Sequence, residues 1–453
     1  MRLSLRPLVS AIVLAGAAGS VSAADLMDAF QMARESDPVL AAAEAQRLAT
    51  GENVVQSRAR LLPQISASAS LTDTRTRGQD EYGRSRSYGA SLSQSIYDHG
   101  NYTSLSATKL RDEQAAFQLR AQADNLIVRV ADAYFNVLTA IETLVSSRAE
   151  ERSVKRQLDQ ADKRLEVGLA PITDVHEARA RYDSARANAI AAATALEDAH
   201  EALAEITGVR LDNLQGLEPG FVPKNNIEGD AAEWVSIATE SNPNLLAAEL
   251  ALAAAERDIA TARSGHLPTL AASASIGDNA GWQNTYPGGP NTSGGGSTVG
   301  ISLSVPLYAG GAIQSGVRQA VHGRDIAAEL LEQERRAVVR YTRNAQRSLV
   351  AGEAEVEARR LSVVSAQAAY EASEAGLEVG TRTIVDVLIG QQALFQAQRE
   401  YARARHAFLV NTLRLRQAAG TITVEDLQAV NSVLTADAEA PLVQSDAEAD
   451  AGQ

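Results

Sequence analysis

Two kinds of periodicity alternate along the chain, and each of them occurs twice. At 64–75 and 86–97, apolar or small residues alternate with polar residues, so that isoleucine, leucine and alanine share one face and serine the other. The same alternation returns at 268–277 and 298–308. Alternation of this kind indicates β-strands with one apolar and one polar face. The sequence therefore predicts four strands in two hairpins.

Each predicted hairpin is followed by a long stretch with helical periodicity. After Gly100 and after Gly311, apolar residues recur at spacings of three and four over about 65 residues, which is typical of a coiled-coil seam. The turns at 165–175 and 377–388 end these stretches, and helices of about 35 residues follow. Both turns contain Val-Gly, and glycine readily adopts the left-handed conformation that closes a helix. We therefore expect two helical hairpins with reversing turns at their tips.

The two halves of the chain repeat each other. Leu-Glu-Val-Gly begins both tip turns, and Leu-Pro precedes the first strand of each half. Each half opens with a short helix, and Asp37-Pro38 or Asn242-Pro243 then begins an alanine-rich helix of about 25 residues. Residues 24–227 and 228–434 are therefore predicted to be two structural repeats that arose by duplication.

The predicted helix lengths suggest how the elements are arranged. A helix of about 65 residues matches the summed length of the two shorter helices in the same repeat, so these should stack end to end beside it. The junctions then fall at one level. We expect a small mixed α/β domain there, formed by the segment before Pro38, residues 208–226 and the residues after Gly420.

The two ends of the chain differ in composition from the rest. Residues 1–23 combine Arg2 and Arg6 with an apolar run and a small-residue cleavage site, which predicts a cleaved signal peptide. The apolar run is too short for a membrane anchor, and no later stretch is apolar enough for a membrane helix. Residues 435–453 contain acidic but no basic residues and are predicted to form a disordered tail.

Composition excludes several function classes. The formal net charge of -14 argues against binding to nucleic acid. The chain has no cysteine, which excludes disulfides and thiolate metal sites, and its six histidines lack ligand spacing. Gly310-Gly311 follows a predicted strand, but no Gly-Lys-Ser/Thr motif of a phosphate loop follows. We therefore expect neither an enzyme nor a bound metal or cofactor.

Several motifs together make nearly the whole mature chain resemble the TolC-type family of trimeric outer-membrane efflux and secretion channels. They are Leu-Leu-Pro-Gln (61–64), Ala-Tyr-Phe-Asn-Val-Leu (133–138), Arg-Gln-Leu-Asp-Gln (156–160), Val-Gly-Leu-Ala-Pro-Ile-Thr-Asp-Val (167–175), His-Leu-Pro-Thr-Leu (266–270) and Val-Gly-Thr-Arg-Thr-Ile-Val-Asp-Val-Leu (379–388).

The resemblance implies a mainly α fold with a membrane β part. Three chains would form a twelve-stranded outer-membrane β-barrel, with four strands from each chain, continued by a long periplasmic α-helical barrel. This trimer agrees with the strand count, because four strands cannot close and an eight-stranded barrel is filled by its own side chains. Tyr97 and Tyr308, at matching strand ends, are predicted to belong to an aromatic girdle facing outer-membrane lipid.

The implied function is that of an outer-membrane exit duct in a tripartite efflux pump, a type I secretion system or both. The implied partners are a periplasmic adaptor and an inner-membrane transporter of the RND, ABC or MFS type. The alternative is a periplasmic structural or adaptor coiled coil without a pore. The four alternating strands favour the channel, because a soluble coiled coil does not need them.

The resemblance also implies roles for residues at the two tip turns. Asp386 matches an acidic ring at the periplasmic entrance, although the residues alone favour a helix N-terminal carboxylate stabilised by the helix dipole. Thr173 and Arg382 match a hydrogen-bonded pair that holds the channel closed. Asp174 matches a further closing link whose tyrosine partner is Leu377 here, and the family's second entrance aspartate is replaced by Ile389. The residues that match adaptor contacts are Val167, Gly168, Leu169, Val379, Gly380 and Thr381.

Overall fold

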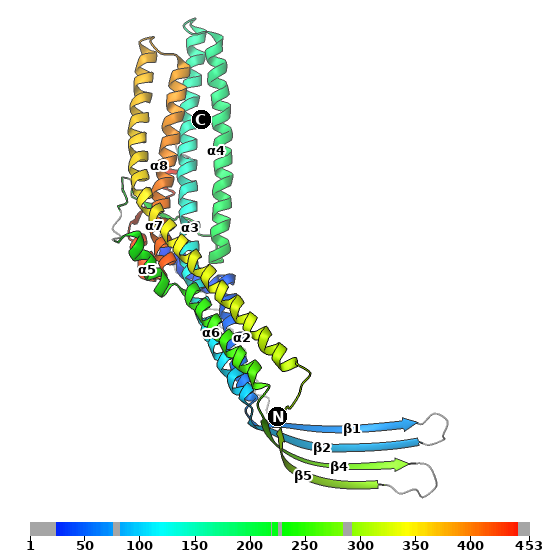
Figure 1. Cartoon of the computed structure of the whole chain (residues 1–453). Helices are drawn as coiled ribbons and strands as arrows, with labels where there is room; N and C mark the ends of the chain where they lie inside the picture. The colour runs from blue at the N-terminus through cyan, green and yellow to red at the C-terminus, as the bar shows by residue number, and fades with distance from the viewer. Residues whose placement is uncertain (1–23, 76–81, 219, 225–228, 284–291, 443–453) are drawn as a thin grey trace.

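The computed structural model describes residues 24–75, 82–218, 220–224, 229–283 and 292–442. The predicted signal peptide lies outside this part of the chain. The molecule is elongated, with two helical hairpins at one end and four long strands at the other (Figure 1). The helices are α1 (Leu26–Ser36), α2 (Pro38–Ala59), α3 (His99–Glu166), α4 (Ile172–Thr207), α5 (Ala231–Ser241), α6 (Pro243–Ser264), α7 (Ala312–Glu378), α8 (Ile384–Ala419) and α9 (Val424–Asn431). The strands are β1 (Gln64–Arg75), β2 (Tyr82–Tyr97), β3 (Gln215–Leu217), β4 (Thr269–Gln283), β5 (Thr292–Ser304) and β6 (Leu434–Asp437).

The long helices form as the periodicity predicts. α3 has 68 residues and α7 has 67, whereas α4 and α8 have 36 each. The first turn of α3 is capped by Asp98, whose carboxylate accepts a hydrogen bond from the Gly100 N–H at 2.8 Å. No helix in the described ranges is both long enough and apolar enough to cross a membrane.

The shorter helices pack in succession along the long ones, as their lengths predict. α4 lies beside the tip-side part of α3 and α2 beside its strand-side part; α8 and α6 lie in the same way beside α7 (Figure 1). α6 also packs against α3, so the two repeats share one bundle on the strand side.

Two left-handed glycines allow the short helices to meet. Gly208 (φ 74°) ends α4 and Gly420 (φ 72°) ends α8. A Cβ atom on Gly420 would lie 2.5 Å from the Ser241 carbonyl oxygen and 2.6 Å from the Asn242 Cα. A Cβ atom on Gly208 would lie 2.9 Å from the Ser36 Cβ. Each glycine therefore supplies both the helix end and the space for the next helix.

The junction residues differ between the two repeats. The buried Asp37 carboxylate caps α2 and accepts a hydrogen bond from the Arg129 guanidinium at 2.6 Å. Asn242 occupies the equivalent position, where its side-chain amide donates to the Ala418 carbonyl oxygen at 3.0 Å. The first repeat thus uses an ion pair where the second uses a neutral hydrogen bond.

A small mixed domain surrounds the bundle at this level, as predicted. It contains α1, α5, α9 and the antiparallel pair β3–β6. The buried Tyr134 of α3 ties it to the bundle, because its hydroxyl lies 2.8 Å from the Gln215 carbonyl oxygen and 3.1 Å from that of Ala24. Burial raises the pKa of Tyr134, so its proton remains available for these contacts.

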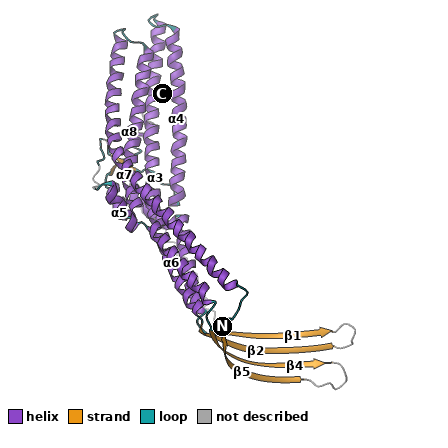
Figure 2. Cartoon of the chain, viewed as in Figure 1, coloured by secondary structure: helices purple, strands orange, loops and turns teal. Residues whose placement is uncertain are grey.

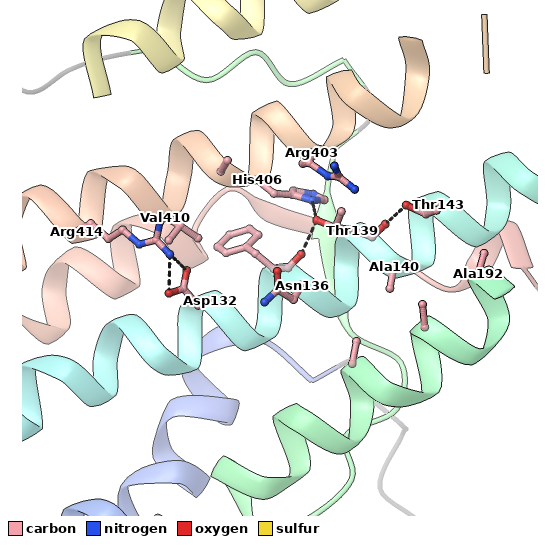
Figure 3. A pocket seen from close by; sticks show the side chains of 14 residues that line it. Asp132, Asn136, Thr139, Ala140, Thr143, Ala192, Arg403, His406, Val410 and Arg414 are labelled. Atoms are coloured by element: carbon pink, nitrogen blue, oxygen red, sulfur yellow. Dashed lines mark hydrogen bonds and ion pairs between the residues drawn. The ribbon is translucent and has the colours of Figure 1, made fainter. Parts of the chain in front are cut away.

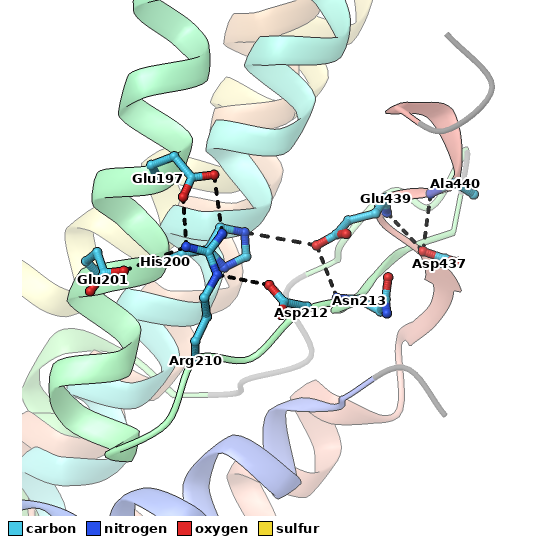
Figure 4. Close-up of polar contacts among 9 residues, drawn as sticks. All are labelled: Glu197, His200, Glu201, Arg210, Asp212, Asn213, Asp437, Glu439 and Ala440. Atoms are coloured by element: carbon cyan, nitrogen blue, oxygen red, sulfur yellow. Dashed lines mark hydrogen bonds and ion pairs between the residues drawn. The ribbon is translucent and has the colours of Figure 1, made fainter. Parts of the chain in front are cut away.

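The start of the predicted acidic tail is ordered, which corrects the proposed boundary at residue 435. β6 pairs with β3, and the Ala438 N–H donates to the Leu214 carbonyl oxygen at 3.0 Å. The Glu439 carboxylate accepts a hydrogen bond from the Asn213 N–H at 3.1 Å and lies 4.0 Å from the buried His200 on α4 (Figure 4). Backbone pairing with β3 outweighs the low hydrophobicity of this segment. Residues 443–453 lie outside the described residues.

The four long strands form one antiparallel sheet in the order β1-β2-β4-β5 (Figure 2). Its register places Ile65 opposite Leu92, and Ala274 opposite Val299, on a single apolar face. β2, β4 and β5 each extend further towards the hairpin tips than predicted.

The predicted strand 298–308 is wrong at its second end, because β5 stops at Ser304. Pro306 lacks the backbone N–H that a continuing strand would need. Tyr308 therefore lies outside the sheet and is 89% exposed, whereas Tyr97 is the last residue of β2.

We predict that Gly420→Ala destabilises the protein by at least about 1–2 kcal/mol, the usual cost of a left-handed non-glycine residue, because the methyl group also meets the Ser241 carbonyl. Denaturant unfolding of the detergent-purified protein would measure this change. Gly316→Ala is the matched control: this glycine lies within α7 with open space around it, so alanine should stabilise the helix by about 0.5–1 kcal/mol. Equal stability of the two variants would contradict the proposed role of Gly420.

Candidate functional site at the hairpin tips

The two tip turns have the same backbone geometry. Gly168 (φ 75°) and Gly380 (φ 78°) are both left-handed. The residue after each glycine donates its N–H to the carbonyl five positions earlier, at 2.7 Å from Leu169 and 2.8 Å from Thr381. Together with the hydrogen bond donated by each glycine N–H, this is a Schellman motif, which satisfies the last carbonyl groups of the long helix. The shared Leu-Glu-Val-Gly sequence therefore produces the same sharp reversal in both repeats.

Apolar side chains at these turns point into solvent. Val167, Leu169 and Val379 are 68%, 78% and 75% exposed. Gly168, Gly380 and Thr381 are exposed as well. Contacts within one chain do not explain apolar residues in these positions, so the tips present a surface suited to contact with another molecule.

Asp386 is the N3 residue of α8 and forms a capping box with Thr383. Its carboxylate accepts hydrogen bonds from the Thr383 N–H at 3.0 Å and from the Thr383 hydroxyl at 2.9 Å. These hydrogen bonds, aided by the charge of Arg382, lower the pKa of Asp386. The helix-capping alternative for Asp386 is thus realised in the structure, and its place at a channel entrance stays a prediction.

Arg382 packs within its own hairpin. A Cβ atom on Gly376 would lie 2.6 Å from the Arg382 Cγ, so glycine at 376 makes room for the arginine stem. Within the described part of the chain, no hydrogen bond or ion pair joins Arg382 to Thr173 or Asp174. The structure therefore does not bring the expected closing pair together in one chain. Leu377, which occupies the tyrosine position of the family, packs against the apolar cluster beneath the tips.

That apolar cluster joins the two hairpins below their turns. Ile384 and Leu388 of α8 are 5% and 2% exposed. They pack against residues of the first hairpin, which are Val154, Leu158, Ala161, Val175, Ala178 and Ala185. The relative position of the two tips thus depends on α8 staying seated on α3 and α4.

Polar contacts continue this interface away from the tips, with carboxylates on α3 and arginines on α8. Arg399 lies 2.8 Å from Glu150. Further along, one guanidinium nitrogen of Arg414 lies 2.9 Å from both carboxylate oxygens of Asp132 (Figure 3). Sequence reasoning missed these pairs because their partners are more than 240 positions apart. We call them, together with Glu142–Arg405, the α3–α8 charge ladder.

The middle pair of the ladder joins a buried arginine to a carboxylate that is a third exposed. Arg405 is 8% exposed and donates to the Glu142 carboxylate at 3.2 Å. Burial raises the pKa of Glu142, and Arg405 counteracts this increase. The adjacent His406 is 2% exposed and is hydrogen-bonded through Nδ1 to the Thr139 hydroxyl at 2.8 Å (Figure 3). Burial, reinforced by the charge of Arg405, lowers the pKa of His406 to about 3, so the ring is neutral at physiological pH.

A cavity of about 520 Å³ lies beside this interface, lined by residues of α3, α4 and α8. Its walls include His406 and Arg403, with alanines of α4 on the opposite side (Figure 3). Within the described ranges, no three His, Cys, Asp or Glu side chains are grouped to hold a metal ion.

Known proteins match this chain over most of its length. The family model "Outer membrane efflux protein" matches residues 29–209 and 234–421, one segment in each repeat.

The chain belongs to the outer membrane efflux protein family.

Individual members of the family agree with this assignment. The outer membrane protein TolC of Vibrio cholerae is 37% identical over 433 residues, covering 95% of this chain and 98% of that protein. The alkaline protease secretion protein AprF of Pseudomonas aeruginosa is 29% identical, covering 89% of this chain and 86% of that protein. The crystal structure of the Campylobacter jejuni CmeC outer membrane channel has a TM-score of 0.74 at 18% identity, covering 96% of this chain and 98% of that one, and shows the same fold.

Family membership identifies the chain as an outer-membrane efflux or secretion channel that extends into the periplasm, and not as an enzyme. The two matched segments also confirm the internal repeat. The apolar tips, the capped Asp386 and the charge ladder are therefore features of a channel wall and its periplasmic end. The roles of individual tip residues stay predictions.

We predict that Arg405→Met destabilises the channel by about 2–3 kcal/mol, because it leaves Glu142 without its cation. This is below the roughly 3–5 kcal/mol typical of a fully buried pair, since the Glu142 side chain is a third exposed. Without Arg405, the pKa of Glu142 should rise further. The folded variant would then hold a proton that the unfolded chain releases, so its stability deficit should shrink as the pH falls from 7 to 5.

Denaturant unfolding at the two pH values, followed by helical circular dichroism, measures this effect. Arg403→Met is the matched control, because Arg403 is exposed and lies two positions away on the same helix. A deficit in Arg405→Met that does not depend on pH would contradict an unpaired Glu142 as its cause.

Proposed function

We propose that three copies of this chain form a closed twelve-stranded barrel in the outer membrane, continued by an α-helical barrel in the periplasm. The sheet in one chain has two free edges, β1 and β5, which invite pairing with a neighbouring chain. Its apolar face is open to the surroundings: Ile65, Val299 and Ile301 are between 72% and 84% exposed. Twelve strands would enclose a lumen and turn this face towards lipid, which supports the trimer.

The duct operates as the exit of a tripartite efflux pump, a type I secretion system or both. An inner-membrane transporter of the RND, ABC or MFS type supplies the energy, and a periplasmic adaptor joins it to the duct. The likeness to TolC supports this arrangement, and the likeness to a protein named for alkaline protease secretion supports export of protein cargo. The exposed apolar tips (Val167, Leu169 and Val379) are the surface that the adaptor contacts.

The periplasmic end of the duct is narrow until the partners engage it. Asp386 lies at the start of α8, and in a trimer three copies would face a common axis. Its hydrogen bonds to Thr383 hold its pKa low, which keeps the carboxylates charged despite their mutual repulsion. A ring of carboxylates at a constriction attracts cations. Arg382, Thr173 and Asp174 hold the closed state through contacts that form in the assembled channel.

Single-channel conductance in planar bilayers tests both the duct and its gate. Wild-type protein should give a small conductance, and Arg382→Ser should raise it several-fold, because removing the guanidinium releases the tips. Arg186→Ser, at an exposed position on α4, should behave like wild type. Absence of conductance from folded trimers would contradict the proposal that the protein is a duct. If Arg382→Ser conducts like wild type, Arg382 does not hold the channel closed and other residues must do so.

The charge at the entrance makes a separate prediction about ion selectivity. Asp386→Asn should shift the reversal potential in a salt gradient towards zero, whereas Asp183→Asn on the exposed side of α4 should not. Thr383→Val removes one hydrogen bond to the Asp386 carboxylate, so the pKa of Asp386 should rise towards its usual value. As the pH is lowered, cation preference should then be lost at a higher pH in Thr383→Val than in wild type. Reversal potentials that are unchanged in Asp386→Asn would rule out Asp386 as the selectivity ring.

A further inference from the structure

A groove follows α3 between α4 and α8, and the cavity of about 520 Å³ beside the charge ladder lies in this groove (Figure 3). Asp132 and Asn136 line it from α3. They are two positions before and two positions after Tyr134, which corresponds to about 200° around a helix in each direction. The Tyr134 hydroxyl contacts the small mixed domain, so the groove opens on the opposite side of the bundle.

This position indicates where the groove lies in an assembled channel. In a duct, the small mixed domain must be on the outside, because on the inside it would block the passage. The groove on the opposite side of the bundle therefore faces the lumen of the proposed barrel.

Much of the cavity lining is apolar. The buried rings of Phe135 and His406 lie at its floor, with their centroids 5.5 Å apart. Methyl groups line both flanks, from Ala195 and Ala199 on α4 and from Ala407 on α8. Small side chains on both flanks leave a slot that suits a flat apolar body. The cavity volume also falls within the range of roughly 300–1,000 Å³ that is usual for small-molecule sites.

Arg403 is the charged lining residue that has no partner. The Asp132 carboxylate is bound by Arg414 through both of its oxygens, at 2.9 Å. His406 is neutral at physiological pH, as its burial requires. Arg403 lines the cavity from α8, and within the described part of the chain it forms neither a hydrogen bond nor an ion pair. The cavity thus combines apolar walls with one free guanidinium group.

The carboxylates around the cavity do not occupy Arg403. Glu142, Glu150 and Glu400 lie on the same two helices, and each is paired with a different arginine. Asp198 of α4 is exposed and lies outside the lining. Arg403 therefore remains open to an anion that enters the groove.

We propose that this cavity binds small aromatic anions, with Arg403 holding the anionic group and the slot between α4 and α8 enclosing the ring. A guanidinium group donates two parallel hydrogen bonds to a carboxylate, which fixes the ligand as well as attracting it. The site is formed within one chain, and its place in the lumen wall rests on the proposed barrel. Such a site would let the wall of the duct contact amphiphilic cargo on its way out.

Isothermal titration calorimetry of full-length trimers in detergent tests the site, with 2-naphthoate as the ligand and the heat of mixing with micelles alone subtracted. Wild type should bind one 2-naphthoate per chain. It should bind uncharged 2-naphthalenemethanol and the saturated anion decahydro-2-naphthoate several-fold more weakly. Arg403→Gln should weaken binding of 2-naphthoate about tenfold, because a charge-assisted hydrogen bond is lost. Arg403→Lys should recover part of this loss.

A second variant tests the cavity independently of its charge. Ala195→Leu fills the slot from an exposed position of α4, so it should abolish binding without unfolding the protein. Ala187→Leu makes the same change two turns away, outside the lining, and should bind like wild type. Arg179→Gln and Asp198→Asn change exposed charges of α4 outside the lining and should not weaken binding.

Two results would overturn the site: no saturable binding to wild type, or unchanged affinity in both Arg403→Gln and Ala195→Leu. Equal affinity for 2-naphthoate and decahydro-2-naphthoate would overturn the aromatic class of ligand.

Single-channel recordings separate this site from the proposed duct. Added 2-naphthoate should lower the current through wild type and have much less effect on Arg403→Gln. Binding that leaves the current unchanged would overturn the placement of the site in the lumen wall. Normal binding by folded trimers that do not conduct would contradict the duct and support the site.

Discussion

The contact between α3 and α8 is the constraint on which the arrangement of the two repeats depends. Each repeat contributes one helical hairpin, and α8 is the element of the second repeat that packs against the first near the tips. The contact combines an apolar cluster with a ladder of carboxylates on α3 and guanidiniums on α8. A buried charge without its partner is costly, so this ladder fixes the register of the two helices more sharply than apolar packing alone. Any motion that separates the tips must either open these ion pairs or move both helices together.

The second requirement is that the short helices meet end to end. α3 and α7 each run the full length of the bundle, about 65 residues, without a break. The path beside each of them is made of two shorter helices, so the backbone must end one helix and begin the next part-way along. Gly208 and Gly420 supply this break at a single level, where α1, α5, α9 and β3–β6 cover the exposed helix ends. The Tyr134 hydroxyl on α3 contacts the carbonyl oxygens of Ala24 and Gln215, which holds the small mixed domain against the bundle.

Local patterns predicted most of the fold. Strict alternation located the four strands, glycine located the tip turns, and comparison of helix lengths gave the stacking of the short helices. These signals work because each is set by neighbours within a few residues. The end of β5 was misjudged because the alternation continues through Pro306, which has no N–H to donate. The beginning of the tail was misjudged because pairing between β6 and β3 joins segments more than 200 residues apart.

The site was less predictable than the fold, because most of its contacts join residues that are far apart in the sequence. The capping box of Asp386 could be seen from Thr383, three positions earlier, and it is present. The contact between Arg382 and Gly376 depends on how the turn closes, and the sequence offered no sign of it. The charge ladder links residues from opposite repeats, so no window of sequence contains both members of a pair. The link between Thr173 and Arg382 came from resemblance alone, and one chain does not form it.

The unequal junctions at Asp37 and Asn242 have a consequence for the history of the chain. A duplicated gene begins with two interchangeable halves. Here one half has acquired a buried acid that needs Arg129, while the other has a neutral amide that needs only a backbone carbonyl. The buried acid and the arginine that compensates it belong to the same half, so loss of Arg129 would leave an unpaired buried charge at the first junction alone. The second junction depends on a backbone carbonyl and is independent of any charged partner.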